Sequence, residues 1–151
     1  MKKYLILFAI LSALVACKQN TSALTSNAQL TAGSQSSVQA FIDNAALEQA
    51  FKDKKSNIFV EGNGVVKKLL PDDNKGSRHQ KFLVTISDEQ ILLFAHNIDL
   101  AKPVPIAVGD TVQFRGEYVY NPKGGVVHWT HHDPQANIEG GWIKHNGQIY
   151  Q

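Results

Sequence analysis

The sequence predicts a mainly β protein: a small five-stranded OB-fold-like barrel with a short N-terminal helix and a C-terminal hairpin. Segments rich in Val, Ile, Leu and Phe alternate with turns rich in Gly, Pro, Asn and Asp. The first of these segments contains Gly62 and Gly64, which allow a strand to bend, and a long connection separates the third from the fourth. An open antiparallel sheet, or a small sandwich with the helix packed across it, is the alternative.

The predicted elements follow in order along the chain. Apolar residues at near-helical spacing predict a helix ahead of the strands; they are Val38, Phe41, Ile42, Ala45, Ala46 and Phe51. The alternating pattern then predicts strands and intervening turns. The strands are expected at residues 58–70, 79–86, 90–95, 111–120 and 126–132, and the turns at 71–76, 87–89 and 121–125. Residues 142–150 form a closing hairpin around Asn146 and Gly147.

The N-terminus has the pattern of a bacterial lipoprotein signal peptide. Lys2 and Lys3 precede an apolar run over residues 4–14, and this run is shorter than the about 20 apolar residues that a bilayer-spanning helix needs. The letters LVAC at residues 14–17 match the lipobox, in which the cysteine is lipidated before the chain is cut on its N-terminal side. We therefore expect residues 1–16 to be a removed signal peptide and Cys17 to be the membrane anchor.

The lipobox also predicts a location and a domain division. Lys18, rather than Asp, follows the cysteine, which favours an exported protein at the outer membrane facing the periplasm. Residues 17–37 comprise the lipidated Cys17 and a flexible polar tether with few large apolar side chains. Residues 38–151 have the length of a single OB-like β domain, which we expect to be a monomer.

Removal of the signal peptide changes the charge balance and the available chemistry. The full chain has 15 basic residues, two of which are Lys2 and Lys3, so that 13 basic residues balance its 13 acidic ones after cleavage. A general attraction to nucleic acid is therefore not expected. Cys17 is the only cysteine, so its lipidation leaves no thiol for a disulfide, a zinc-thiolate site or a cysteine nucleophile.

All six histidines lie in the predicted domain, and three of them fall in the letters HWTHH at residues 128–132. On a strand, side chains alternate between faces, so that His128 and His132 would share a face at a separation of about 13 Å, too far for one metal ion. The same alternation places His131 beside Asp133 on the other face. A metal site would therefore need ligands from other segments of the chain.

His96 and Asp99, after the third predicted strand, are the best such ligands, and His79 is the next. The candidate ligands of a divalent metal are thus His79, His96, Asp99, His128, His131 and Asp133. Structural hydrogen bonding of these histidines is the alternative. A histidine beside an aspartate is also compatible with general base catalysis.

Basic and aromatic residues supply a second set of candidates, for nucleic-acid contacts. The basic residues near the turn between the first two strands are Lys67, Lys68, Lys75, Arg78 and Lys81. The aromatic residues that offer either stacking faces or core packing are Phe82, Phe94, Phe114, Tyr118 and Trp129. Core packing explains most of these aromatics more simply.

Two strings of residues resemble a known bacterial family: HNIDLA at residues 96–101 and GGVVHWTHHDP at residues 124–134. GWI at 141–143, HNG at 145–147 and the terminal YQ fit the same pattern. The chain resembles the domain-of-unknown-function family 3465 over nearly the whole domain after Ile58. This family carries no established reaction, so the resemblance implies an exported setting and no particular chemistry.

Two functional hypotheses of different classes follow. The first is an envelope lipoprotein whose OB-like domain binds a metal or a small ligand near the histidine and aspartate candidates. The second is a metal-dependent phosphodiesterase or nuclease that acts outside the cytoplasm. The sequence is compatible with a binding protein and with an enzyme.

Overall fold

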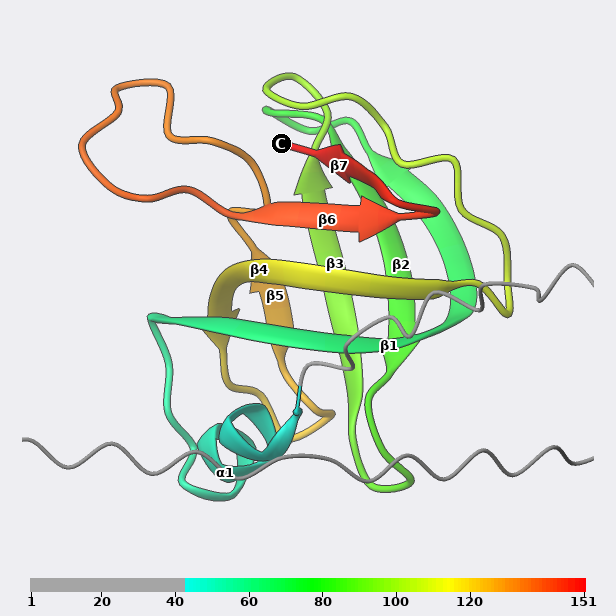
Figure 1. The fold of residues 1–151 in the computed structure, drawn as a ribbon, viewed down its shortest axis with the longest axis vertical. Coiled ribbons are helices and arrows are strands. Elements are labelled where there is room, and N and C mark those ends of the chain that lie inside the picture. The colour runs from blue at the N-terminus through cyan, green and yellow to red at the C-terminus, as the bar shows by residue number, and fades with distance from the viewer. Residues whose placement is uncertain (1–42) are drawn as a thin grey trace, which may run out of the picture. The chain divides into compact units, whose positions relative to one another are not determined.

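Five strands close on one another in a ring in the computed structural model, which describes residues 43–151 (Figure 1). The strands of the sheet are β1 (Ile58–Asp73), β2 (His79–Thr85), β3 (Ile91–Asn97), β4 (Thr111–Val119), β5 (Val126–His128), β6 (Trp142–His145) and β7 (Gln148–Tyr150). β1 to β3 pair in sequence, β3 pairs with β5, and β4 pairs with both β5 and β1. Only the pairing of β3 with β5 is parallel. This topology confirms the predicted OB-fold-like class.

A two-stranded hairpin and a helix lie outside this ring. β6 and β7 form the predicted C-terminal hairpin, and β6 extends the sheet beyond β4. α1 (Ala45–Lys52) lies at one end of the ring and inserts Leu47 and Ala50 into the core (Figure 1). The side chain of Asn44 exchanges two hydrogen bonds with the backbone of Asn63 on β1, which ties the helix to the strands. Within residues 43–151, no helix has the length and apolarity to cross a membrane.

The core is built around three aromatic rings. Phe82 and Phe94 stack with their ring centroids 5.0 Å apart, and Phe114 meets Phe94 edge-on at 4.8 Å. These three rings, and Tyr118, are fully buried. Their burial confirms core packing, and it leaves none of the four free to stack on a nucleic acid.

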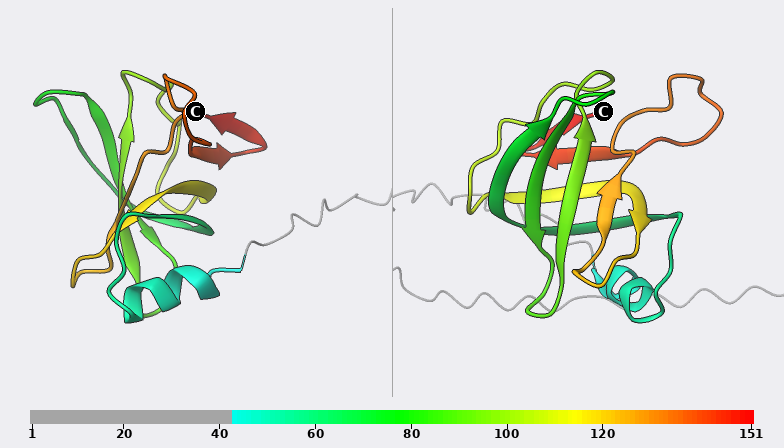
Figure 2. Two further views of the ribbon diagram at one scale, coloured as in Figure 1. Left: turned by 90° about the vertical axis from the view of Figure 1, so that its left-hand side faces the viewer. Right: turned by 180° about the vertical axis from the view of Figure 1, so that it is seen from behind.

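Strand alternation gives the ring an inner and an outer face. On β2 and β3 the even-numbered residues Phe82, Val84, Leu92 and Phe94 point into the core, and the odd-numbered side chains between them are only partly buried. β2, β3, β5 and the second half of β1 form one wall of the ring, and the first half of β1, β4 and β6 cross behind it in the view from the back (Figure 2). The outer face of this wall positions the site described below.

The structure shifts several predicted boundaries. β1 continues past Pro71 to Asp73, because an irregularity in its pairing with β2 between Leu70 and Asp73 accommodates a residue without a backbone N–H. β3 continues to Asn97, which pairs with His79. The predicted strand at residues 126–132 is wrong beyond His128, for a reason given below. The signal peptide, Cys17, the tether and the start of the predicted helix lie outside the described residues.

Closure between β3 and β5 requires glycine at position 124. The φ angle of Gly124 is +120°, and a Cβ atom there would collide with the backbone carbonyl of Ile91. The carbonyl oxygen of Gly124 accepts hydrogen bonds from Gln90 Nε2 at 3.0 Å and from the Tyr118 hydroxyl at 3.2 Å. The Gly-Gly turn thus brings the start of β5 against β3.

We expect Gly124→Ala to lower the free energy of unfolding by at least about 3 kcal/mol, because it adds a collision to the strain of a positive φ. Gly76→Ala is the matched control, since Gly76 also has a positive φ, of 75°, but has open space around it. That variant should cost about 1–2 kcal/mol. Urea denaturation measures both values, and equal costs would contradict the role of Gly124 in closing the ring.

Candidate functional site

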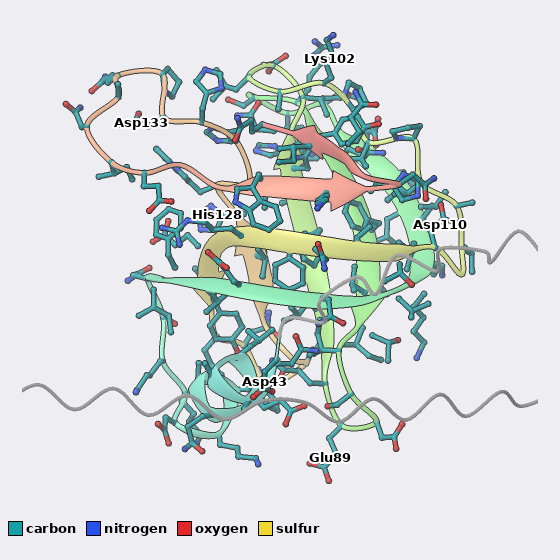
Figure 3. All side chains as sticks on the ribbon, viewed as in Figure 1. Asp43, Glu89, Lys102, Asp110, His128 and Asp133 are labelled. Atoms are coloured by element: carbon teal, nitrogen blue, oxygen red, sulfur yellow. The ribbon has the colours of Figure 1, made fainter. Side chains whose placement is uncertain are left out.

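A cleft of about 620 Å³ lies on the outer face of β2, β3 and β5. His79 on β2, Ala95 and Asn97 on β3, His128 on β5 and the nearby Leu100 form its floor and one side. The segment that follows β5 forms the other side through Trp129, His131, Asp133, Pro134, Gln135, Asn137 and Ile138. Figure 3 shows Asp133 on this projecting segment and His128 nearer the strands. The outer face of the second and third strands is also where OB-folds bind their ligands.

The backbone of Trp129 shapes the cleft. Its φ angle is +54°, in the left-handed region that costs a bulky residue about 1–2 kcal/mol. This turn ends β5 and breaks the strand alternation, so that Thr130 points into the core and is fully buried. His128, Trp129 and His131 consequently line the same cleft, whereas alternation along a strand would have separated His128 from His131.

His96 is buried beneath the cleft and is bonded on both sides of its ring. Nε2 donates to the carbonyl oxygen of Lys102 at 3.1 Å, so Nδ1 is unprotonated and accepts the hydroxyl of Thr130 at 2.8 Å. Burial lowers the pKa of His96, and the nearby imidazoles of His131 and His79 lower it further. His96 is therefore a neutral residue that joins the loop after β3 to the segment after β5, with neither nitrogen left for a metal.

Asp99 is engaged with Arg78 rather than with the histidines. Its carboxylate accepts the backbone N–H and the Nε–H of Arg78, both at 2.7 Å. These hydrogen bonds and the charge of Arg78 lower the pKa of Asp99. The pair holds the turn that leads into β2, and it directs the Asp99 carboxylate to Arg78.

Asp133 organises the projecting segment. Its two carboxylate oxygens accept the backbone N–H groups of Gln135, Asn137 and Ile138 at 3.1, 2.7 and 3.2 Å. The hydrogen bond from Gln135 is the main cause of the lowered pKa of Asp133. The carboxylate thus folds the segment back on itself in a loop.

Within residues 43–151, one ring nitrogen of His131 is hydrogen-bonded and the other is not. Nδ1 lies 2.7 Å from the carbonyl oxygen of His132, which only accepts, so Nδ1 carries the proton and Nε2 of the neutral ring is an acceptor. Among the described residues nothing bonds Nε2. The ring packs against the indole of Trp129 with centroids 5.1 Å apart.

Arg115, which sequence reasoning missed, secures the far end of the projecting segment. It lies on β4 and donates to the Gly140 carbonyl at 3.2 Å, while its guanidinium pairs with Glu139 at 3.2 Å and Glu61 at 3.3 Å. The backbone N–H of Gly141 donates to the His131 carbonyl at 2.8 Å. Both ends of the segment are therefore attached to the barrel.

The structure brings four of the six predicted metal ligands to the cleft and not the other two. His79, His128, His131 and Asp133 line it, whereas His96 is buried below it and Asp99 faces Arg78. In the part of the chain that the structure describes, no three His, Cys, Asp or Glu side chains lie close enough together to hold a metal ion. The metal site stays a prediction.

The remaining lining residues were not expected from the sequence. The sequence predicts Trp129 to be a stacking or core residue and does not single out the amide side chains of the cleft, which belong to Asn97, Gln135 and Asn137. The one signal for them was the Asp133-Pro134 pair, which is typical of a turn and predicts that a loop begins there.

The basic candidates do not enter the cleft. Among the described residues that line it, none is Lys or Arg. Lys68 and Lys81 lie on the outer face, paired in register with Leu83 and Leu70, and Lys67 is exposed. Arg78 is held by Asp99. The basic residues that the sequence suggested for nucleic-acid contacts are therefore not part of the cleft.

The fold and the cleft define a class of protein: a small OB-fold-like β domain with a polar cleft on the outer face of β2, β3 and β5 that no Lys or Arg lines among the described residues. A family model described as "Protein of unknown function (DUF3465)" matches residues 30–151. The chain belongs to this family, which confirms the resemblance seen in its sequence. No curated protein in the comparison matches the chain.

The lowered pKa of His96 makes stability depend on pH. The folded protein resists protonation of His96, so below its usual pKa of 6.5 the unfolded chain binds more protons and stability falls as the pH falls. The slope from this residue is at most about 1.4 kcal/mol per pH unit. Asp99 and Asp133 have pKa values below 3.8 and contribute only in more acidic solution.

We therefore expect His96→Gln to flatten the loss of stability between about pH 7 and pH 5, because glutamine does not titrate but retains an amide that can bond on both sides. Urea denaturation at several pH values measures the slope for the variant and the wild type. Identical slopes would show that His96 is not a buried neutral residue.

Proposed function

We propose that this domain is a binding module whose cleft takes a small uncharged ligand. The proposal rests on a difference between two sets of polar groups in the cleft wall: those hydrogen-bonded within the protein and those without a partner among the described residues. Those that shape the wall are bonded within the protein, namely His96, Asp99, Asp133 and Arg115. His131, which also lines the cleft, is 3 % exposed, and its Nε2 has no partner among the described residues. A wall shaped before the ligand arrives lowers the entropic cost of binding.

The dimensions of the cleft also support binding. Its volume of about 620 Å³ lies within the range of about 300–1,000 Å³ that is typical of ligand pockets. Its lining combines apolar side chains with a few polar groups, which is the usual composition of such pockets.

Two sets of polar groups that resemble catalytic ones have structural roles instead. Thr130 and His96 have the arrangement of a hydroxyl activated by a base, but Thr130 is fully buried and no substrate can reach it. The Asp133 carboxylate is occupied by three backbone N–H groups. Neither residue is available to attack a substrate or to transfer a proton to one.

A cleft-filling variant tests the proposal. Ala95 lines the cleft from β3, so we expect Ala95→Phe to fill it and abolish the binding of uncharged polar fragments found in a ligand-detected NMR screen of the full chain. Leu93→Phe is the matched control, because Leu93 lies two residues earlier on the same strand and face but does not line the cleft. Fragment binding that survives Ala95→Phe, or that both variants abolish, would count against this cleft.

We also propose that the protein is exported and held by lipid on Cys17 at a membrane, which we expect to be the outer membrane. The LVAC letters at residues 14–17, behind a basic and then apolar N-terminus, support this proposal. The lipid chains, rather than a protein segment, would then hold the domain at the membrane surface.

The lipid anchor has a direct test. In bacteria fed an alkyne-bearing fatty acid, we expect the chain to be labelled and to sediment with membranes, and Cys17→Ala to lose both properties because no other thiol is present. Labelling of the Cys17→Ala chain, or an unlabelled wild type, would contradict the anchor.

A further inference from the structure

We infer that the ligand of this cleft is a carbohydrate, bound through its hydroxyl groups and the C–H faces of neutral sugar rings. The inference rests on the proposed binding function and names its ligand class. Three properties of the cleft carry it: the kinds of free polar atoms, the charge and the apolar surface.

The free polar atoms are a mixture of donors and acceptors. His131 Nε2 is an acceptor. Asn97 Oδ1 accepts the backbone N–H of Asp99 at 2.9 Å, which leaves the amide N–H groups of Asn97 as donors. Asn137 Nδ2 donates to Gln135 Oε1 at 3.0 Å, which leaves Asn137 Oδ1 as an acceptor and Gln135 Nε2 as a donor.

A ligand with hydroxyl groups matches this mixture. Each hydroxyl both donates and accepts, so neighbouring hydroxyls on one ring can satisfy the acceptor of His131 and the donors of Asn97 and Gln135 together. A phosphate or carboxylate group only accepts. It would place oxygen lone pairs against His131 Nε2 and Asn137 Oδ1 and leave those acceptors unpaired.

The charge of the cleft points to a neutral ligand. Its described lining contains no Lys or Arg, and its only carboxylate, on Asp133, already accepts three backbone N–H groups. An ionic ligand desolvated in the cleft would therefore meet no Lys or Arg side chain among the described lining residues.

The apolar lining provides surface for the C–H faces of sugar rings. Trp129 contributes an aromatic side chain, and Leu100 and Ile138 are 39 % and 51 % exposed at the rim. The Trp129 and His131 rings contact each other at 5.1 Å, so a flat nucleobase has no room to insert between them. A sugar needs one apolar wall and a polar edge, and the cleft has both.

The test uses the full chain in a polyoxyethylene detergent, which carries no sugar headgroup. A glycan array compares neutral oligosaccharides with sulfated, phosphorylated and sialylated ones, and calorimetry measures the affinity of each hit. Nucleosides are measured in parallel by ligand-detected NMR. We expect binding of neutral oligosaccharides and weaker or no binding of their charged forms.

Two variants connect binding to the named atoms. Gln135→Leu removes a free donor and should weaken sugar binding about three- to tenfold, and His131→Phe removes the acceptor and should weaken it about tenfold or more. Gln148→Leu is the control, since Gln148 is exposed on β7 and lies outside the cleft, and it should bind as the wild type does. Gln135 is exposed, so its variant reports on binding even where His131→Phe is unstable.

The outcomes separate the two proposals. Absence of binding across the neutral glycans, preferential binding of charged glycans, or binding unaffected by Gln135→Leu overturns the carbohydrate inference. If Ala95→Phe abolishes the binding of nucleosides or other fragments while no neutral glycan binds the wild type, the carbohydrate inference is overturned and the binding function stands. If Ala95→Phe leaves the binding of all fragments unchanged, the cleft is not the binding site and both proposals are overturned.

Discussion

The cleft depends on one buried hydrogen bond, between Nδ1 of His96 and the hydroxyl of Thr130. It joins the end of β3 to the segment that leaves β5, and the second nitrogen of His96 bonds the Lys102 carbonyl in the following loop. For Thr130 to reach inward, the backbone must turn at Trp129, and that turn carries Trp129 and His131 to the outer face. The interior hydrogen bond and the exterior cleft therefore have the same structural cause.

The acidic residues have structural roles, and the free chemistry of the cleft belongs to neutral side chains. Asp99 holds Arg78, and Asp133 folds the projecting segment around its own backbone N–H groups. Arg115 attaches the end of that segment to β4. These charged groups thus hold the shape of the segment, while imidazole and amide groups line the cleft beside the Asp133 carboxylate, and our proposal of an uncharged ligand rests on this division.

Strand alternation in the sequence was enough to predict most of the fold. The apolar residues of β2 and β3 alternate as a half-buried strand requires, and Gly124 with Gly125 marked the turn that brings β5 against β3. The same rule failed at Trp129, because a bulky residue seldom adopts a positive φ and nothing in its neighbours signals one. The sequence analysis therefore placed His128 and His131 on opposite faces of a strand, whereas the strand ends at His128 and both residues line the cleft.

By itself, the sequence determined the mainly β class and the membership of the family, because these depend on local periodicity, turn residues and short sequence motifs. The tertiary structure decided that the strands close into a ring, because closure depends on pairings between distant strands. Only the tertiary structure decided which histidines are structural and which face the cleft. His96 and Thr130 are 34 residues apart, as are Gln90 and Gly124. The role of each of these residues depends on its distant partner, which the neighbouring sequence does not predict. The partners of His96 and Thr130 satisfy polar atoms that would otherwise be buried without a hydrogen bond.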